Sequence, residues 1–210
     1  MGSHCLVHKN HMLEARFLGV HLDAARPFAE PGVEPHYGPD RGFQLAHVKL
    51  ELDVDPNAQR LRGRATLDIQ PLASGLGPVV LDLEDVTVSS VVREDGRALE
   101  FRQSTDELLV RGLDGPGKIV VTYEGRPRRG MYFTGPTEAE PKRQRMAWTQ
   151  CQDEDGHFVF PCIDHPGVKV PIDIVITAPA GFTVVSNGKL VSHDKASNTW
   201  SWTQKEPIPA

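Results

Sequence analysis

The sequence has no apolar run that approaches the roughly 18 residues needed for a membrane-spanning helix. Its N-terminus also lacks the basic start, apolar core and small-residue cleavage site that are typical of a secretory signal peptide. We therefore expect no membrane partner. Without an export signal, we expect a cytoplasmic protein.

Cysteine is equally scarce, with three residues in a chain of 210. Cys5, Cys151 and Cys162 are too few, and odd in number, for the disulfide framework of a small secreted domain. In a reducing compartment such thiols stay unpaired. We expect all three to be free thiols.

Positive charge is in deficit, because 23 basic residues stand against 28 acidic ones and leave a net charge of −5. A negative field repels both the phosphate backbone of nucleic acids and an anionic membrane surface. The charge balance therefore predicts that nucleic acid is not a partner.

Convincing helical periodicity is absent as well, and from Phe43 onward apolar residues recur with a period of two, which is typical of half-buried strands. The pattern runs through residues 48–54 and, after an Asp55-Pro56-Asn57 turn, through residues 60–69, which predicts a hairpin. Further strands are expected at residues 79–83, 86–93, 108–110, 118–123, 170–178, 183–186, 189–193 and 198–203.

Short strands at regular spacing with one buried face predict an all-β domain, built as a β-sandwich or a saddle-shaped double sheet. We place it at residues 43–210. Residues 1–42 are broken by Pro27, Pro31, Pro35 and Pro39, so they are expected to form an N-terminal arm after a short helical stretch over residues 12–18. The opening MGSH is compatible with an expression-tag remnant, and the origin of residues 1–20 is left open.

Residues 148–169, WTQCQDEDGHFVFPCIDHPGVK, concentrate amides, carboxylates, imidazoles and thiols between two strand-like segments. They resemble the signature that closes the N-terminal β domain of zinc aminopeptidases of the aminopeptidase N and leukotriene hydrolase type. That signature reads T-Q-x-[QE], a polar spacer, D-A-R, then F-P-C-x-D-x-P and a lysine. The matching residues are Thr149, Gln150, Gln152, Asp155, Phe160, Pro161, Cys162, Asp164, Pro166 and Lys169.

The likeness departs at Gly156 and His157, where the family usually has Ala and Arg. It extends over residues 43–210, through segments such as DVDPNAQRLRGRATLDI and APAGFTVVSNGKL. It implies a saddle-shaped antiparallel β-sandwich. It also implies a non-catalytic N-terminal domain of an enzyme that removes N-terminal residues from peptides.

The H-E-x-x-H helix, the downstream Glu ligand and the Gly-x-Met-Glu-Asn strand of that family belong to its next domain and are missing from this sequence. We therefore expect no catalytic residue, metal ligand or cofactor in these 210 residues. The resemblance implies zinc in the parent enzyme, and it implies two partners, the C-terminal catalytic domain of the same chain and a peptide substrate.

Gln152 is the main candidate for substrate binding. In the family, the residue at this position helps to bind the free α-amino group of the substrate near the zinc. An amide oxygen can accept a hydrogen bond from an ammonium group without the desolvation cost of a full carboxylate. Gln150 would share its strand face, so we take it as a second candidate. The alternative is that both amides are structural, surface or loop-capping groups.

The acidic residues of the segment favour a structural interpretation, because acids near a turn more often cap loops than form catalytic pairs or cation sites. The resemblance implies that Asp155 and Asp164 hold the loop through backbone hydrogen bonds. A rival interpretation is a zinc site. Its spacing, C-x₅-H-x₄-C-x₂-H, lacks the close cysteine pair that is typical of structural zinc sites. The ligands of that site would be Cys151, His157, Cys162 and His165.

Two other interpretations use the remaining reactive and aromatic residues. A cysteine paired with a histidine could act as a nucleophile, although the apolar neighbours of Cys162 favour burial. Trp148, Trp200 and Trp202 could form a platform for sugar stacking, although Trp200 and Trp202 share a strand face and favour packing. The alternative function is accordingly a stand-alone β-sandwich module that binds protein or carbohydrate.

Overall fold

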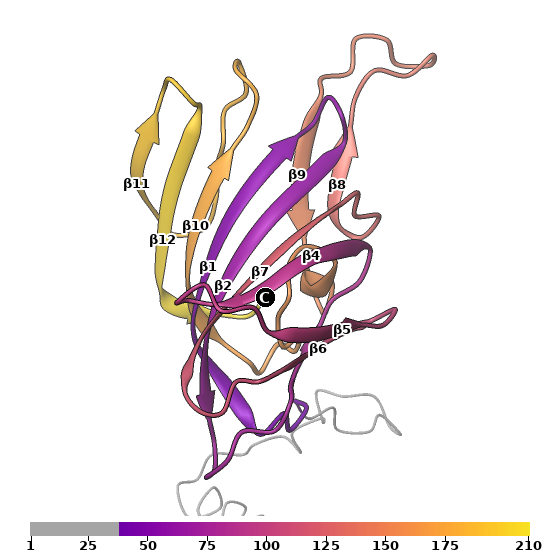
Figure 1. The fold of residues 1–210 in the computed structure, drawn as a ribbon. Coiled ribbons are helices and arrows are strands. Elements are labelled where there is room, and N and C mark those ends of the chain that lie inside the picture. The colour runs from indigo at the N-terminus through magenta and orange to yellow at the C-terminus, as the bar shows by residue number, and fades with distance from the viewer. Residues whose placement is uncertain (1–37) are drawn as a thin grey trace, which may run out of the picture. The chain divides into compact units, whose positions relative to one another are not determined.

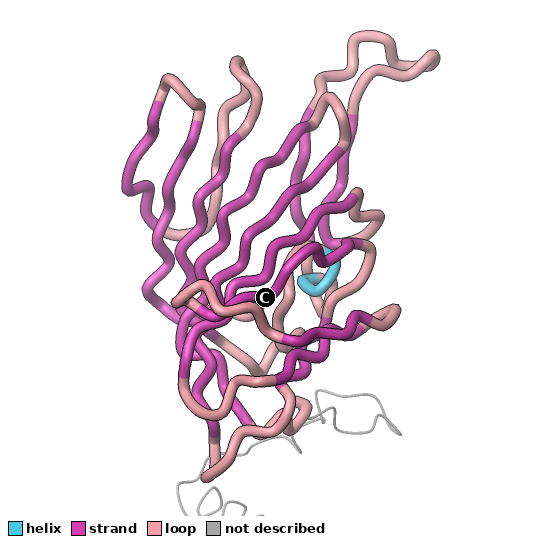
Figure 2. The backbone as a smooth tube through the Cα atoms, in the orientation of Figure 1, coloured by secondary structure: helices cyan, strands magenta, loops and turns pink. Residues whose placement is uncertain are grey.

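A computed structural model describes residues 38–210, and nearly all of its regular elements are strands (Figures 1 and 2). The expectations for the arm before residue 38, including the short helix over residues 12–18, lie outside the described residues. Within residues 38–210 no helix is long and apolar enough to cross a membrane.

The largest element is a seven-stranded sheet in the order β11-β12-β10-β1-β2-β7-β4. Its strands turn progressively from β11 to β4, which gives the sheet a strong twist (Figure 1). The strands are β1 (Phe43–Asp55), β2 (Arg60–Pro71), β4 (Val86–Arg93), β7 (Gly117–Gly125), β10 (Val170–Thr177), β11 (Lys189–Asp194) and β12 (Thr199–Ile208).

Two small antiparallel sheets accompany the large one. The first has the order β3-β6-β5, and the second is a hairpin of two strands. Their strands are β3 (Val79–Asp82), β5 (Glu100–Gln103) and β6 (Glu107–Arg111), and then β8 (Gly130–Thr134) and β9 (Met146–Gln150).

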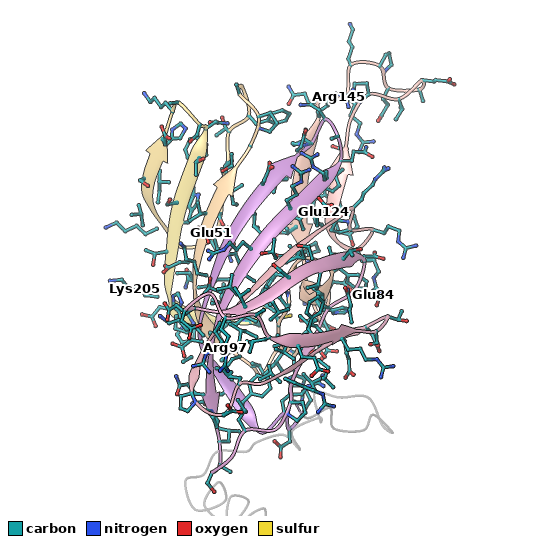
Figure 3. The ribbon with its side chains drawn as sticks, in the orientation of Figure 1. Glu51, Glu84, Arg97, Glu124, Arg145 and Lys205 are labelled. Atoms are coloured by element: carbon teal, nitrogen blue, oxygen red, sulfur yellow. The ribbon has the colours of Figure 1, made fainter. Side chains whose placement is uncertain are left out.

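The core forms where one face of the large sheet meets the three-stranded sheet and the segment after β9. Alternate residues of β1, such as Val48 and Leu50, are buried together with Leu81 of β3 and Leu108 of β6 in a single apolar cluster. The other face of the large sheet is polar. It carries ion pairs that cross between strands, including Arg64 with Glu51 and Arg62 with Glu124, and both glutamates are labelled in Figure 3.

The predicted all-β fold is confirmed, with two corrections. β1 pairs in parallel with β10, Val48 opposite Ile172, so the large sheet is mixed and not purely antiparallel. The strand predicted at residues 183–186 is wrong, since this segment is an unpaired loop between β10 and β11. Its β-branched residues favour a strand locally, but no strand within residues 38–210 pairs with it.

Candidate functional site

The signature segment begins on β9 and then leaves the sheet. β9 pairs with β8, with Trp148 opposite Tyr132 and Gln150 opposite Gly130. Residues 151–169 follow as a loop that contains one short 3₁₀ turn, Gly156–Phe158, before β10 begins at Val170. This turn is the cyan segment in Figure 2.

Apolar side chains anchor the loop from the inside. Phe158, Val159, Phe160 and Ile163 are all buried, and the last three belong to the main core cluster. Cys162 extends this anchor through its backbone, which exchanges hydrogen bonds of 2.8 and 3.2 Å with that of Asp82 at the end of β3. The loop is therefore part of the folded core, although its backbone is irregular.

Asp164 provides a polar anchor, as expected, while Asp155 acts differently from the expectation. The buried Asp164 carboxylate accepts a hydrogen bond of 2.9 Å from the backbone N–H of His157, and the Asp164 N–H donates to the Asp82 carboxylate at 2.8 Å. Asp155 instead forms an ion pair of 2.8 Å with Arg129. Both carboxylates stabilise the loop, the first through the backbone and the second through a side chain.

His157 lies against the same carboxylate, because its Nδ1 is 2.6 Å from Asp164 Oδ2. Burial of the ring is the largest influence and lowers the pKa of His157, but the hydrogen bond and charge of Asp164, together with Asp82 and Glu84, outweigh it and raise the pKa. Asp82 and Glu84 were not candidates from the sequence. They precede β4, and no sequence pattern connects them with the loop.

Gln150 and Gln152 are both exposed and border a groove of about 760 Å³. Neither side-chain amide makes a hydrogen bond to any residue from 38 to 210. Only Gln150 lies on the strand, because β9 ends there and Gln152 lies in the following turn, with a cis peptide bond to Asp153. The turn, and not strand alternation, brings the second amide to the groove.

Apolar side chains line most of this groove. They come from the core-facing side of β1 and β10, where Leu52 lies opposite Ile176, and from the partly exposed Trp148 of β9. The loop after β10 adds Val185, whose side chain is 82% exposed. An open apolar groove with two free amides at its edge is a combination typical of a ligand-binding or docking surface.

The structure does not assemble the rival zinc site. In the described part of the chain no three His, Cys, Asp or Glu side chains form a group that could hold a metal ion. The four residues point to different partners: Cys151 Sγ to the Gly130 carbonyl, His157 to Asp164, and His165 Nδ1 to the Gly167 N–H, while Cys162 is buried in the core. These side chains do not fit zinc.

Both described cysteines are free thiols, and their surroundings do not suit a nucleophile. Burial, helped by the charges of Asp164 and Asp155, raises the pKa of Cys151 to about 11. Burial also raises the pKa of Cys162, whose side chain is almost fully enclosed. A reactive cysteine needs the opposite shift, because the thiolate is the nucleophile.

This predicts slow alkylation of both thiols in the folded chain. At about pH 8 the raised pKa of Cys151 lowers its thiolate fraction, and hence its labelling rate by iodoacetamide, about 100-fold below that of the same chain in urea. The rate should rise with pH up to about 11. Cys162 should be labelled only after unfolding. Peptide mapping by mass spectrometry measures each site, and rapid labelling of either thiol in the folded chain would contradict the prediction.

The three tryptophans do not form one platform. Trp148 stacks on Tyr132 in the small hairpin, with ring centroids 4.7 Å apart. Trp200 lies on β12, where it stacks on His193 and donates a hydrogen bond to Asn198. Trp202 lies on the same strand and is half-buried. The residues of the sugar-stacking interpretation are thus divided between two sheets.

Comparison with known proteins relates this arrangement to one family. The family model described as the peptidase M1 N-terminal domain matches residues 36–210. Leucine aminopeptidase 2 of Neurospora crassa is 25% identical over 217 residues, an alignment that covers 96% of this chain and 32% of that protein.

Two solved structures share the fold. Leukotriene A4 hydrolase from Saccharomyces cerevisiae has a TM-score of 0.70 at 20% identity and covers 89% of this chain and 31% of its own. An M1 zinc metallopeptidase from Deinococcus radiodurans has a TM-score of 0.68 at 23% identity. The match covers 84% of this chain and 42% of the metallopeptidase chain. The chain spans about a third of the length of the leucine aminopeptidase 2 relatives that it matches.

Proposed function

This chain belongs to the peptidase M1 N-terminal domain family, and from that premise we propose that it is the non-catalytic N-terminal domain of a zinc-dependent aminopeptidase. In this role it forms one wall of the substrate cleft and binds the α-amino group of a peptide through Gln152. Gln150 is a second contact at the same edge. The thiols of Cys151 and Cys162, both free, support a cytoplasmic location for the enzyme.

The observation that carries the proposal is the pair of exposed amides at the groove. An amide left without a protein partner at the edge of an apolar groove can hydrogen-bond a ligand without first breaking an internal bond. A peptide ammonium group offers three N–H donors, and the oxygen of Gln152 can accept one of them. The buried side chains of the loop hold the backbone behind this amide in place.

The apolar groove supports a catalytic domain as the second partner. Apolar surface of this kind is normally covered in the assembled protein, because its exposure to water is unfavourable. The relatives are about three times as long as this chain, so they have further domains that could cover such a surface. Residues 38–210 contain no group of side chains that fits zinc, so we assign no part of the metal site to them.

The test is a comparison of the 210-residue chain with a longer protein that adds a catalytic domain carrying the H-E-x-x-H motif. We expect the 210-residue chain to bind no stoichiometric zinc and to hydrolyse no chromogenic aminoacyl substrate, and the longer protein to do both. Elemental analysis and a colorimetric assay measure this. Activity or tightly bound zinc in the 210-residue chain would overturn the proposal, and tight protein or carbohydrate binding without any hydrolase would favour the stand-alone module.

A further inference from the structure

The His157 imidazole lies among three carboxylates that come from two separate parts of the chain. Asp164 belongs to its own loop, and its Oδ2 is 2.6 Å from Nδ1. Glu84, labelled in Figure 3, belongs to the connection between β3 and β4, and its Oε2 is 3.8 Å from Nε2. Asp82, in the same part of the chain as Glu84, accepts a hydrogen bond from the Asp164 N–H.

The nearby arginines form ion pairs with carboxylates other than Asp164 and Glu84. Arg41 pairs with Asp82 and Glu107, and Arg128 pairs with Asp85. Arg129 pairs with Asp155 and lies over the ring of Phe158, 5.0 Å from its centroid. Among residues 38–210, His157 is therefore the group that lies within 4 Å of both the Asp164 and the Glu84 carboxylate and can balance their charge.

The two protonation states of His157 make different contacts here. A neutral imidazole has one N–H, and Asp164 would take it at Nδ1, which leaves Nε2 without a proton beside the Glu84 carboxylate. The imidazolium carries an N–H on both nitrogens, so it keeps the hydrogen bond to Asp164 and places its positive charge 3.8 Å from the Glu84 carboxylate. It adds a side-chain ion pair to the backbone bond of 3.0 Å from the Glu84 N–H to the His157 carbonyl.

We propose that His157 is a positioning residue, whose imidazolium joins Asp164 to Glu84 and so holds the loop that carries Gln152 against the connection between β3 and β4. The loop is then ordered in a pH-dependent way. The role of the Gln152 amide, which the ordered loop positions, rests on the proposed function. The ion pairs of His157 do not depend on that function.

The direction of the pH dependence follows from the raised pKa of His157. A histidine whose pKa is raised on folding stabilises the folded state fully below its ordinary value of 6.5. That contribution is lost as the pH rises through the raised value. The loop should therefore be most ordered in mildly acidic solution and less ordered in alkaline solution.

Hydrogen exchange of the backbone amides of residues 151–164 in the 210-residue chain tests this directly. After correction for intrinsic rates, we expect their protection to fall roughly fivefold between about pH 6 and about pH 9. His157→Gln should show the low protection at both values, because it cannot carry charge. His157→Arg should stay protected at both, because guanidinium remains charged throughout.

His47→Gln is the matched control. His47 also pairs with an aspartate, Asp173, at 3.2 Å, but on the exposed face of the large sheet, so its loss should leave the loop profile unchanged. A wild-type loop without pH dependence, or a His157→Gln profile that follows wild type, would overturn the proposal.

A second measurement does not depend on how the variants at position 157 fold. Titration of the His157 ring protons by NMR should give a lower pKa in Glu84→Gln than in wild type, and an equal pKa would overturn the proposed ion pair. Failure here is distinct from failure of the proposed function. If the proposed function is wrong, the protection of the loop still depends on pH as described, but Gln152→Ala stays fully active in the longer enzyme.

Discussion

Gln152→Ala, made in a protein that joins this domain to its catalytic domain, is expected to lower kcat/KM for aminoacyl substrates by roughly 10- to 100-fold. The substitution removes the acceptor for a charged donor, and hydrogen bonds to charged groups contribute about 1–3 kcal/mol. Folding should be unaffected, because the side chain is exposed and makes no hydrogen bond within residues 38–210. Steady-state kinetics and thermal unfolding measure the two effects.

Two variants sharpen this experiment. Gln44→Ala removes another exposed glutamine, on β1 and outside the residues that line the groove, and should leave both kinetics and stability unchanged. Gln152→Glu keeps an acceptor oxygen and should retain more activity than Gln152→Ala. Full activity of Gln152→Ala would show that the amide does not bind the substrate, whatever the groove does.

Gly63→Ala should destabilise the domain by about 3 kcal/mol, because there is no room for a methyl group at this position. Gly63 lies on the central strand β2, directly opposite Tyr123 of β7. A Cβ atom there would lie 2.1 Å from the ring of Tyr123. That ring is almost fully buried, so it cannot swing into solvent, and the strands or the core must shift instead.

Urea or thermal unfolding measures this loss of stability. Gly77→Ala is the matched control, because a Cβ atom at position 77 meets nothing within 4 Å and its backbone is not in the left-handed region. It should change the free energy of unfolding by less than about 0.5 kcal/mol. A Gly63→Ala chain as stable as wild type would mean that Tyr123 does not lie over Gly63.

The sequence by itself determined those features that depend on neighbouring residues. The alternation from Val48 to Val54 and the turn at Asp55 predicted the β1–β2 hairpin, because strand faces repeat every two residues and the turn sets the register. The signature motif predicted the family, and the position of Asp164 within it predicted an anchor for the loop. Each of these signals lies within a short stretch of chain.

The tertiary structure alone decided the features that depend on residues far apart in the chain. The parallel pairing of β1 with β10 and the unpaired state of residues 183–186 depend on which strands meet. The meeting of His157 with Glu84 depends on the packing of the loop beside the end of β3. Local patterns report which residues prefer burial or extension, but hydrogen-bond partners and uncovered apolar faces are set by long-range packing, which no short segment encodes.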